Sequence, residues 1–557
     1  MSHYKTGMAD PERIKHEKDA LDVWDDMFRF AKAGFSAISP DDIIRMRWYG
    51  MYQQKPNDGY FMWRIKLPGG RVNPLQLREI GKLANQYAHG FGDITTRQDI
   101  QLHWLTIDMF PALFDRIYKT CGLYTDFACG DNPRNICSCP LNDLIPNQLC
   151  AMGDVVQNIS DMYRAGGKEF SNLPRKFKGS IAACPLHCHQ PQINDIGVFG
   201  VNRDKNGSVE RGVAVVVGGG LSSTPHFAQG LRVFIPEAKV QEQLPEICRQ
   251  ITHIFEDSEE CRYKRKHARF KFVVAEKGWQ WVRDELERRL GYALEHDESI
   301  VDPHGALHTD HMGVGLQNNG LYYVGAPVER GRWTGDQMIA VADLAERFGA
   351  AGQSQIRLSQ KQNLLIVNVP KENVDALSRQ LDAIGLPPKA PLWRSNLVCC
   401  TGTQFCNLAV TETKQRAQDL LKHLEKEVPE LDSSIMVSVS GCPNSCAHVQ
   451  IADIGLTGTK AIYKDEKVDA FDLLLGGCLG DQKAWAKTIV PKIPAMLVQD
   501  VLVKLARNYL ANRAEFEDGN PETFAAFVSR HDVGQLAAYS AIEGWTPPLK
   551  PVRHEVK

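Results

Sequence analysis

Residues 184–200 (CPLHCHQPQINDIGVFG) occur a second time, 258 positions later, as residues 442–458 (CPNSCAHVQIADIGLTG). The two stretches align without a gap, and nine of their seventeen positions are identical. The same spacing places Gly218, Gly219 and Gly220, which follow the strand-like VAVVV, on residues 476–478, which follow DLLL. Similarity at one fixed spacing is the signature of an internal duplication.

A second pair of similar segments lies upstream in each half. The segment from Tyr60 (YFMWRIKLPGG…ITTRQDIQLHWLTI) resembles the segment from Leu321 (LYYVGAPVERG…IRLSQKQNLLIVNV). Residues 95–98 (TTRQ) then align with residues 359–362 (SQKQ), 264 positions apart, so a six-residue insertion or deletion separates the two modules. Each upstream unit alternates polar and apolar residues, continues into an amphipathic stretch such as LQLREIGKLANQYAHGF, and alternates again, which predicts strand, helix, strand.

The downstream units combine short β runs that end in glycine with helical patterns, of which residues 413–428 and 336–348 are the clearest. The predicted fold class is therefore α+β, a duplicated two-module unit with pseudo-twofold symmetry. A duplicated fold of this kind offers a cofactor site between its halves.

Length and charge exclude several classes of protein. A chain of 557 residues is too long for one hydrophobic core, and its net charge of −2 excludes a globally basic nucleic-acid binder. The N-terminal residues 1–19 alternate in charge and lack an apolar run, unlike a signal peptide. No stretch approaches the roughly 18 apolar residues that cross a bilayer. We therefore expect a cytoplasmic protein that binds neither membrane nor nucleic acid.

Four cysteines of the second half have the spacing of an iron–sulfur site. They form the pairs C-x5-C and C-x3-C, whereas a structural zinc site more often uses C-x2-C pairs. Cytosolic cysteines are seldom disulfide-bonded, and four thiolates are the ligand set of a [4Fe–4S] cluster. The sequence predicts this cluster at Cys400, Cys406, Cys442 and Cys446.

The motifs TGTQFC…ETKQRA, GCPNSC…QIADIG, LPRKFK and TTRQ resemble the ferredoxin-dependent nitrite reductase and sulfite reductase hemoprotein family. The resemblance extends from about residue 15 to residue 540 and includes the duplication. It implies siroheme as a second cofactor, placed between the two halves, and it makes Cys446 the thiolate that the cluster shares with the siroheme iron. It also implies electron supply from ferredoxin or a similar small carrier, since the chain holds no G-x-G-x-x-G after a strand.

The resemblance further implies which residues bind the substrate and the siroheme. The family places cations on the substrate side of siroheme, and the matching positions are Arg97, Arg134, Lys176 and Lys178. Lys176 and Lys178 are two residues apart, so on a strand they would share a face. The siroheme carboxylates need basic and backbone N–H partners, for which the candidates are Gly218, Gly219, Gly220, Arg262, Lys264, Lys266, Arg269 and Lys271. A solvated charge run and a tight turn are the alternative interpretations of these two segments.

The same resemblance divides the chain into five parts. We expect a helical extension at 1–57, a ferredoxin-like half-domain at 58–122 and a siroheme and substrate domain at 123–305. A second half-domain follows at 306–388, and residues 389–557 form the domain that carries the cluster.

The substrate has two candidates. The motif CTGTQFCNLAVTETKQRA, the segment EKDALDVWDD and the segment FVSRHD resemble the nitrite-reducing branch. Lys178 resembles the sulfite-reducing branch, which has Lys-x-Lys where ferredoxin nitrite reductases have Lys-x-Asn, although more distant siroheme nitrite reductases also carry this lysine. We predict the six-electron reduction of nitrite to ammonia by a monomeric enzyme, with reduction of sulfite to sulfide as the alternative.

Two other classes of protein remain as rivals. One is a non-catalytic iron–sulfur protein, which would not need the four cations. The other is an RNA-binding protein that uses the basic run of residues 262–271, although Tyr263, Phe270 and Phe272 are its only aromatic residues for stacking.

The first half keeps cysteines of its own. Cys137, Cys139, Cys184 and Cys188 occur there, with His187 and His189 interleaved. We interpret them as thiols near the substrate side or as relics of the duplication; a second metal site and redox-active thiols are the alternatives.

Overall fold

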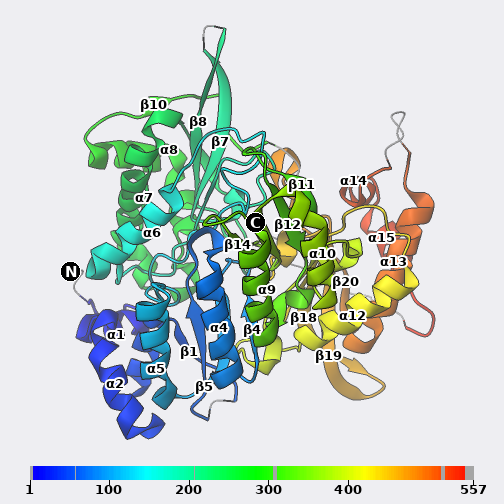
Figure 1. The fold of residues 1–557 in the computed structure, drawn as a ribbon, viewed down its shortest axis with the longest axis horizontal. Coiled ribbons are helices and arrows are strands. Elements are labelled where there is room, and N and C mark those ends of the chain that lie inside the picture. Colours follow the sequence, from blue (N-terminus) through cyan, green and yellow to red (C-terminus); the bar gives the residue numbers. More distant parts are fainter. Residues whose placement is uncertain (1–3, 57, 206, 305–309, 516–520, 546–557) are drawn as a thin grey trace.

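Four five-stranded sheets and their helices form an α+β fold in the residues that the structure describes, which are 4–56, 58–205, 207–304, 310–515 and 521–545. The structure is a computed structural model, drawn in Figure 1. Two sheets are fully antiparallel; of the other two, one contains a single parallel pair of strands and the other contains two.

The strands of each sheet follow a definite order across it. The first antiparallel sheet is β1 (Met51–Gln53), β2 (Phe61–Ile65), β5 (Ile100–Leu105), β4 (Phe91–Ile94) and β13 (Arg332–Thr334). The second is β11 (Gly313–Leu316), β12 (Tyr322–Ala326), β15 (Leu364–Val369), β14 (Gln355–Leu358) and β3 (Arg71–Val72). The first mixed sheet is β10 (Glu295–His296), β9 (Gln229–Pro236), β8 (Ser208–Val217), β7 (Ile196–Lys205) and β6 (Gly179–Ala182). The second mixed sheet is β16 (Leu397–Cys399), β17 (Val437–Ser440), β18 (Ile454–Tyr463), β19 (Glu466–Leu475) and β20 (Lys487–Pro494).

The two antiparallel sheets exchange edge strands. β13 of the second half pairs with β4, so that Arg332 lies opposite Asp93, and β3 of the first half pairs with β14. The helices α4 (Pro74–Tyr87) and α9 (Gly335–Phe348) lie side by side across the same junction (Figure 1). A Cβ atom on Gly81 would come within 2.7 Å of the Gly335 carbonyl oxygen, so this helix pair requires glycine at its crossing. The exchange ties the two halves into one fold.

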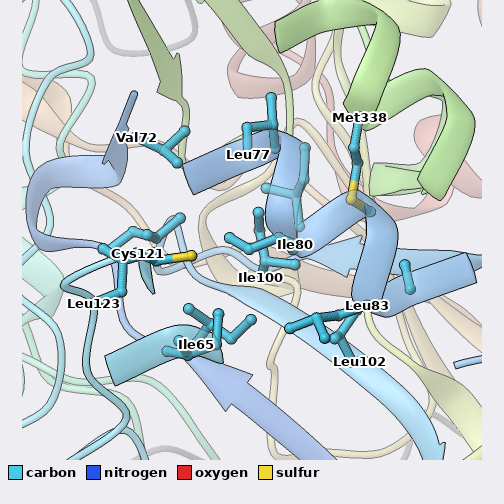
Figure 2. Packing of buried hydrophobic residues seen from close by; sticks show 14 of the residues in the cluster. Ile65, Val72, Leu77, Ile80, Leu83, Ile100, Leu102, Cys121, Leu123 and Met338 are labelled. Carbon is cyan, nitrogen blue, oxygen red and sulfur yellow. The ribbon is translucent and has the colours of Figure 1, made fainter. Parts of the chain in front are cut away.

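Helix α4 covers one face of its sheet because of its apolar spacing. It begins with a capping box in which the Asn73 side chain accepts from Gln76 N and the Gln76 side chain accepts from Asn73 N. Leu77, Ile80 and Leu83 recur at helical spacing and are buried. Figure 2 shows these three side chains lying against Ile65 of β2 and Ile100 and Leu102 of β5, with Met338 of α9 beside them. Helix α9 begins with the equivalent capping box at Thr334 and Gln337.

The downstream domains meet through contacts that obey the pseudo-twofold relation. A shift of 258 positions maps the contact of Gln192 with Gly480 onto that of Gln450 with Ser222, and it maps Phe227 onto Trp485. Gln192 Nε2 donates to Gly480 O at 3.3 Å, and Gly480 N donates to Gln192 Oε1 at 2.7 Å. Likewise, Gln450 Nε2 donates to Ser222 O at 2.6 Å, and Ser222 N donates to Gln450 Oε1 at 3.3 Å. The rings of Phe227 and Trp485 stack with their centroids 3.6 Å apart.

The helices agree closely with the sequence patterns. The segment expected from residue 75 onwards is α4, residues 336–348 lie in α9, and residues 413–428 contain α12 (Lys414–Glu427). No helix within the described ranges is both long enough and apolar enough to span a bilayer. The remaining helices are α1 (Asp10–Glu17), α2 (Trp24–Ala33), α3 (Pro40–Arg45), α5 (Phe110–Phe114), α6 (Val155–Gly166), α7 (Val240–Glu256), α8 (Phe270–Leu290), α10 (Val374–Ala383), α11 (Leu392–Ser395), α13 (Val498–Asn512), α14 (Phe524–Ser529) and α15 (Val533–Tyr539).

Candidate active site

Two neighbouring parallel strands bring the four cysteines of the second half to one edge of a sheet. Cys400 follows β16, and Cys442 and Cys446 follow β17, which is parallel to β16. The turns that carry them are tight: Gly402 has φ +66°, and a Cβ there would come within 2.4 Å of Thr413 Oγ1. Ser445, between Cys442 and Cys446, also has a positive φ of 55°. The local backbone therefore folds the C-x5-C and C-x3-C segments against each other.

The environment of these thiols fits a metal cluster. Gly441 N donates to Cys400 Sγ at 3.2 Å. Burial and the nearby Cys446 together raise the pKa of Cys400 to about 12. Burial also raises the pKa of Cys406 and of Cys442, again with Cys446 as a contributing neighbour. Buried thiols with raised pKa values lose their protons when a bound metal supplies positive charge.

Lys176 and Lys178 do not lie in a strand, which corrects the expectation from their spacing. They precede β6 and flank Phe177, which makes a single parallel bridge to Pro133. That one bridge is enough to extend the segment: Phe177 is buried, and both lysines are half-buried. Among the described residues, no side chain or carbonyl accepts a hydrogen bond from Nζ of either lysine.

The two arginines of the predicted site are held by backbone carbonyls. Arg97 donates to Gly179 O at 3.0 Å, to Asn194 Oδ1 at 3.0 Å and to Asn135 O, while its buried Nε has no partner in the described part of the chain. Arg134 donates to Ala128 O at 3.1 Å and to Gly130 O at 2.6 Å. Within the described residues no carboxylate forms an ion pair with either arginine, so both guanidinium groups are available to an anionic partner.

The four cations and Cys446 act on one another electrostatically. Burial lowers the pKa of Lys176 to about 7, with Arg269 and Arg134 as further causes, while Cys446 opposes the shift. Burial also lowers the pKa of Lys178 well below its usual range, together with Lys176 and Arg97. Thr96, next to Arg97, donates from its Oγ1 to Cys446 O at 3.0 Å. Arg97, Arg134, Lys176 and Lys178, which we call the cation group, thus lie beside the cysteine edge of the other half.

The basic run of residues 262–271 is divided by the structure. Arg269 pairs with Asp195 at 2.8 Å, and a Cβ on Gly220 would lie 3.2 Å from its Nη2. Lys271 donates to Leu221 O at 3.0 Å, and burial lowers its pKa to about 7. Both residues therefore lie next to the cation group, because Asp195 also accepts from Lys178 N at 2.8 Å.

The other members of the run lie elsewhere. Arg262 is buried, and it donates to Glu12 at 2.6 Å, to Asn172 O at 2.9 Å and to Glu256 O at 2.8 Å. Lys264 and Lys266 are exposed. The structure thus places Arg269 beside the cation group, with Lys271 next to Arg269, whereas Arg262 is bound to Glu12 and Lys264 and Lys266 are exposed.

The three glycines do not present free N–H groups. Gly218 N donates to Asp195 O at 2.9 Å, Gly219 N to Asn194 O at 2.8 Å, and Gly220 N to His226 O at 2.9 Å. Gly218 and Gly219 lack room for a side chain: a Cβ on Gly218 would come within 2.6 Å of Val274, and one on Gly219 within 2.5 Å of Gln192 O. Their role in the structure is close packing beside Arg269.

Two residues of this region were missed by sequence reasoning. Burial alone would lower the pKa of Arg64, but Cys129, Asp99 and Cys446 outweigh it and raise that pKa. Arg64 donates to Ala128 O at 2.9 Å, which Arg134 also contacts. Burial, Lys178 and Arg97 lower the pKa of His448 to about 3. Arg64 stands in an ordinary β pattern, FMWRI, so nothing in the sequence singles it out; His448 lies within the repeat, which is a usable signal.

Three of the four first-half cysteines lie together in the structure, and the fourth lies apart from them. Cys139, Cys184 and Cys188 meet His311, and the four ligand atoms lie within 4.8 Å of one another. Cys137 is not part of this group; it is fully buried and makes a parallel bridge to Ser180.

Known proteins share both the sequence and the fold of this chain. The family model for the nitrite and sulphite reductase 4Fe-4S domain matches residues 129–294 and 394–536, and the model for the nitrite/sulfite reductase ferredoxin-like half domain matches residues 52–119 and 315–384. A protein named sulfite reductase [ferredoxin] 1 from Mycolicibacterium paratuberculosis is 34% identical, with 95% of this chain and 96% of that one covered. The assimilatory ferredoxin-dependent nitrite reductase of Haloferax mediterranei is also 34% identical, over 93% of this chain and 91% of its own.

A solved structure agrees with these matches. The NirA protein of Mycobacterium tuberculosis superposes with a TM-score of 0.87 at 33% identity, and the alignment covers 95% of this chain and 97% of the other. The twofold occurrence of each family model corresponds to the duplication seen in the sequence and the sheets. The chain therefore belongs to the nitrite and sulfite reductase family of iron–sulfur oxidoreductases.

Proposed function

We propose that this enzyme reduces nitrite to ammonia, with ferredoxin as the electron donor and with sulfite reduction to sulfide as the alternative reaction. The observation that carries the proposal is the cation group, which lies beside Cys446 and whose four side chains form no ion pair with a carboxylate in the described part of the chain. A purely electron-carrying iron–sulfur protein has no need of four such cations next to its cluster.

Within this proposal Cys400, Cys406, Cys442 and Cys446 would hold the [4Fe–4S] cluster, and Cys446 would be the residue that serves both the cluster and the siroheme. When bound, these two cofactors supply single electrons to the substrate. Arg269, Lys271 and Arg64 would meet siroheme carboxylates in this proposal, because they are basic side chains shielded beside the cation group. The glycines at 218–220 contribute by allowing close approach rather than by donating N–H groups.

The residues of the cation group have two tasks in the proposed reaction. Reduction of nitrite to ammonium takes up six electrons and eight protons and releases two waters. Arg97 and Arg134 carry planar guanidinium groups and would bind and orient the anion. Lys176, with a pKa lowered to about 7, would hold a proton that it can give up and regain near neutral pH.

The choice between substrates rests on a few residues. Relatives named for each activity are 34% identical to this chain, so overall similarity does not separate the substrates. The motif around Cys400 and Cys406 favours nitrite, whereas Lys178 favours sulfite. Measurement of kcat/KM for both anions with a reduced viologen dye decides between them. A preference for nitrite supports our proposal, and a preference for sulfite replaces it with the alternative.

The cation group can be tested by substitution. Arg134→Ala or Lys176→Ala should lower kcat/KM by more than about tenfold, since each removes about 1.4 kcal/mol or more of transition-state stabilisation. The siroheme and cluster absorption bands should remain. Lys119→Ala is a matched control, because the Lys119 side chain is 79% exposed and pairs only with Asp115 at 2.6 Å among the described groups. Wild-type turnover in either test variant would remove that residue from the site.

The electron donor needs a separate test. If ferredoxin docks by charge complementarity, turnover with ferredoxin should fall as salt rises, because salt screens exposed charges. Turnover with a small viologen donor should change little. Equal salt sensitivity with both donors would contradict docking by charge. The monomeric state and the cytoplasmic location stay predictions.

A further inference from the structure

We infer that Cys139, Cys184, Cys188 and His311 bind a single zinc ion in a closed tetrahedral site, apart from the proposed cofactor site. The four ligand atoms lie within 4.8 Å of one another. His311 Nε2 is 3.3 Å from Cys139 Sγ and 3.6 Å from Cys188 Sγ. This group does not depend on which anion the enzyme reduces.

The separations match one small ion rather than a cluster. A tetrahedral zinc ion with Zn–S of about 2.3 Å and Zn–N of about 2.0 Å holds sulfur and nitrogen ligands about 3.6 Å apart. In a [4Fe–4S] cluster each thiolate binds a different iron, so the thiolates are farther apart. Among the described residues, the ligand atoms that lie this close together are those of Cys139, Cys184, Cys188 and His311. Those of the four second-half cysteines do not form such a compact group. Three cysteines and one histidine are also a known structural zinc set.

The site descends from the duplicated cluster-binding loop. Cys184 and Cys188 align with Cys442 and Cys446, and the loops have the same shape: His187 and Ser445 both have positive φ, at 48° and 55°. The hydrogen bond from His187 N to Cys184 O at 3.2 Å corresponds to that from Ser445 N to Cys442 O at 3.4 Å. The first half has therefore kept the loop geometry that presents two thiols on one side.

Cys139 occupies the place of Cys400. Ser138 N donates to Gln98 Oε1 at 2.8 Å, and Cys399 N donates to Gln362 Oε1 at 2.9 Å. Gln98 and Gln362 are equivalent in the repeat, so the residues that follow Ser138 and Cys399 are equivalent as well. Three of the four cluster ligands thus have cysteine counterparts.

The fourth ligand comes from a different part of the chain. His311 precedes β11 and is buried, with 6% of its surface exposed. The neighbouring Asp310 is anchored by Ser359 Oγ and Asn363 Nδ2, each at 2.8 Å. Glycine at 325 is required beside it, because a Cβ there would come within 2.1 Å of His311 O. With the His311 imidazole as its fourth ligand, the site fits a single metal ion rather than an iron–sulfur cluster.

The bound ion would tie the two halves together. Cys139, Cys184 and Cys188 belong to the first downstream domain, and His311 leads into the sheet that begins at β11. Four protein ligands leave no open coordination position, which is the mark of a structural rather than a catalytic zinc site.

The test is metal analysis of the holoenzyme, purified without a polyhistidine tag from cells supplied with zinc. We expect one zinc per chain in addition to the iron, and an X-ray absorption spectrum at the zinc edge with three sulfur ligands at about 2.3 Å and one nitrogen at about 2.0 Å. Zinc well below one atom per chain would overturn the inference. So would a zinc shell of oxygen and nitrogen alone, or a disulfide among the three cysteines.

Variants locate the ion. Cys188→Ser and His311→Ala should each lower the zinc content about tenfold or more while the iron content stays near wild type. Cys248→Ala is the matched control, because it removes a fully buried thiol from helix α7 in a different part of the core. Loss of iron instead of zinc would overturn the inference in favour of a second cluster. If the variants fail to fold, the zinc content and spectrum of the wild type still decide.

Discussion

In the proposed reaction, Lys176 couples its own charge to the binding of the substrate anion. Its pKa is lowered to about 7 from the ordinary value of 10.5, chiefly by burial and then by Arg269 and Arg134. A group with a lowered pKa is charged below that value and neutral above it. A bound anion favours the charged form. Anion binding should therefore draw a proton onto Lys176, which places the proton next to the substrate.

This coupling predicts a pH dependence. As pH rises above about 7, the free enzyme loses the Lys176 charge, so kcat/KM for nitrite should fall by up to about tenfold per pH unit. Nitrite stays ionised over this range and contributes no slope. The measurement is kcat/KM between pH 6 and 9 with a viologen donor. In Lys176→Arg the decline should flatten, since guanidinium stays protonated. A level wild-type profile up to pH 9 would show that Lys176 does not carry the charge.

Lys178 predicts a change in substrate preference. Burial, Lys176 and Arg97 hold its pKa well below the usual range, so an anion must offset that repulsion for Lys178 to be charged. A dianion does this better than a monoanion. Lys178→Asn should therefore raise the nitrite-to-sulfite ratio of kcat/KM, whichever substrate the wild type prefers. Lys119→Ala serves again as the control. A ratio that falls or does not move would show that Lys178 does not reach the anion.

Single residues were predictable where a motif or the repeat pointed to them. Arg97 and Arg134 were found through short motifs, and the structure places both beside Cys446 or its neighbours. Arg262 was chosen for its charge alone, and the structure gives its donors to Glu12 and to carbonyls. His311 stands alone in the sequence, and only the folded chain brings it to three cysteines.

At the scale of elements, the two C-x3-C loops are the same structure used for different ligands. Residues 184–190 and 442–448 share their turn conformations, including positive φ at Gln190 and His448. They differ in the partners that the rest of the chain supplies. Cys406 completes the second quartet in our proposal, and His311 completes the first group.

The loops predict opposite metal losses. Cys446→Ser should abolish turnover and remove iron, because it deletes the thiolate assigned to both cofactors. Cys184→Ser should leave the iron content near wild type and reduce zinc. Iron and zinc per chain, measured on the same preparations, give the answer. Equal iron loss in both variants would show that the cluster is not confined to the second half.

Elements with local signals were predicted well, and elements that depend on distant partners were not. Helices α4, α9 and α12 follow from apolar spacing within one segment. Strands β3 and β13 contain two and three residues, and their partners lie in the other half of the chain. No pattern within such short segments can reveal that pairing. The strand expected at Lys176 and Lys178 failed because one bridge, at Phe177, replaces a ladder.

At the scale of the whole molecule, the halves are joined unequally. In the first antiparallel sheet the exchanged strand places Arg332 opposite Asp93, with bonds of 2.7 and 2.8 Å. The equivalent position in the second sheet pairs Arg357 with Arg71, which are both cationic.

Burial alone would raise the pKa of Asp93, but Lys414, Arg332 and His103 hold it well below its usual range. Its ion pair therefore stabilises the fold at neutral pH and is lost as pH falls into the acid range.

Removing Arg332 should consequently weaken the whole fold. Among the described residues, Arg332→Ala leaves Lys414 and His103 as the basic partners of the buried Asp93, and the loss of one partner from a buried ion pair costs about 3 kcal/mol. Arg78→Ala is the matched control, because Arg78 also bridges the halves but contacts Asp343 and Glu346, whose side chains are 59% and 53% exposed. Exposed pairs contribute less than about 1 kcal/mol. Denaturant midpoints of the two holoenzymes, followed by circular dichroism, should therefore differ clearly, with Arg332→Ala the lower. Equal midpoints would mean that the exchanged strand β13 is held by its backbone ladder and core contacts alone, without help from the buried pair.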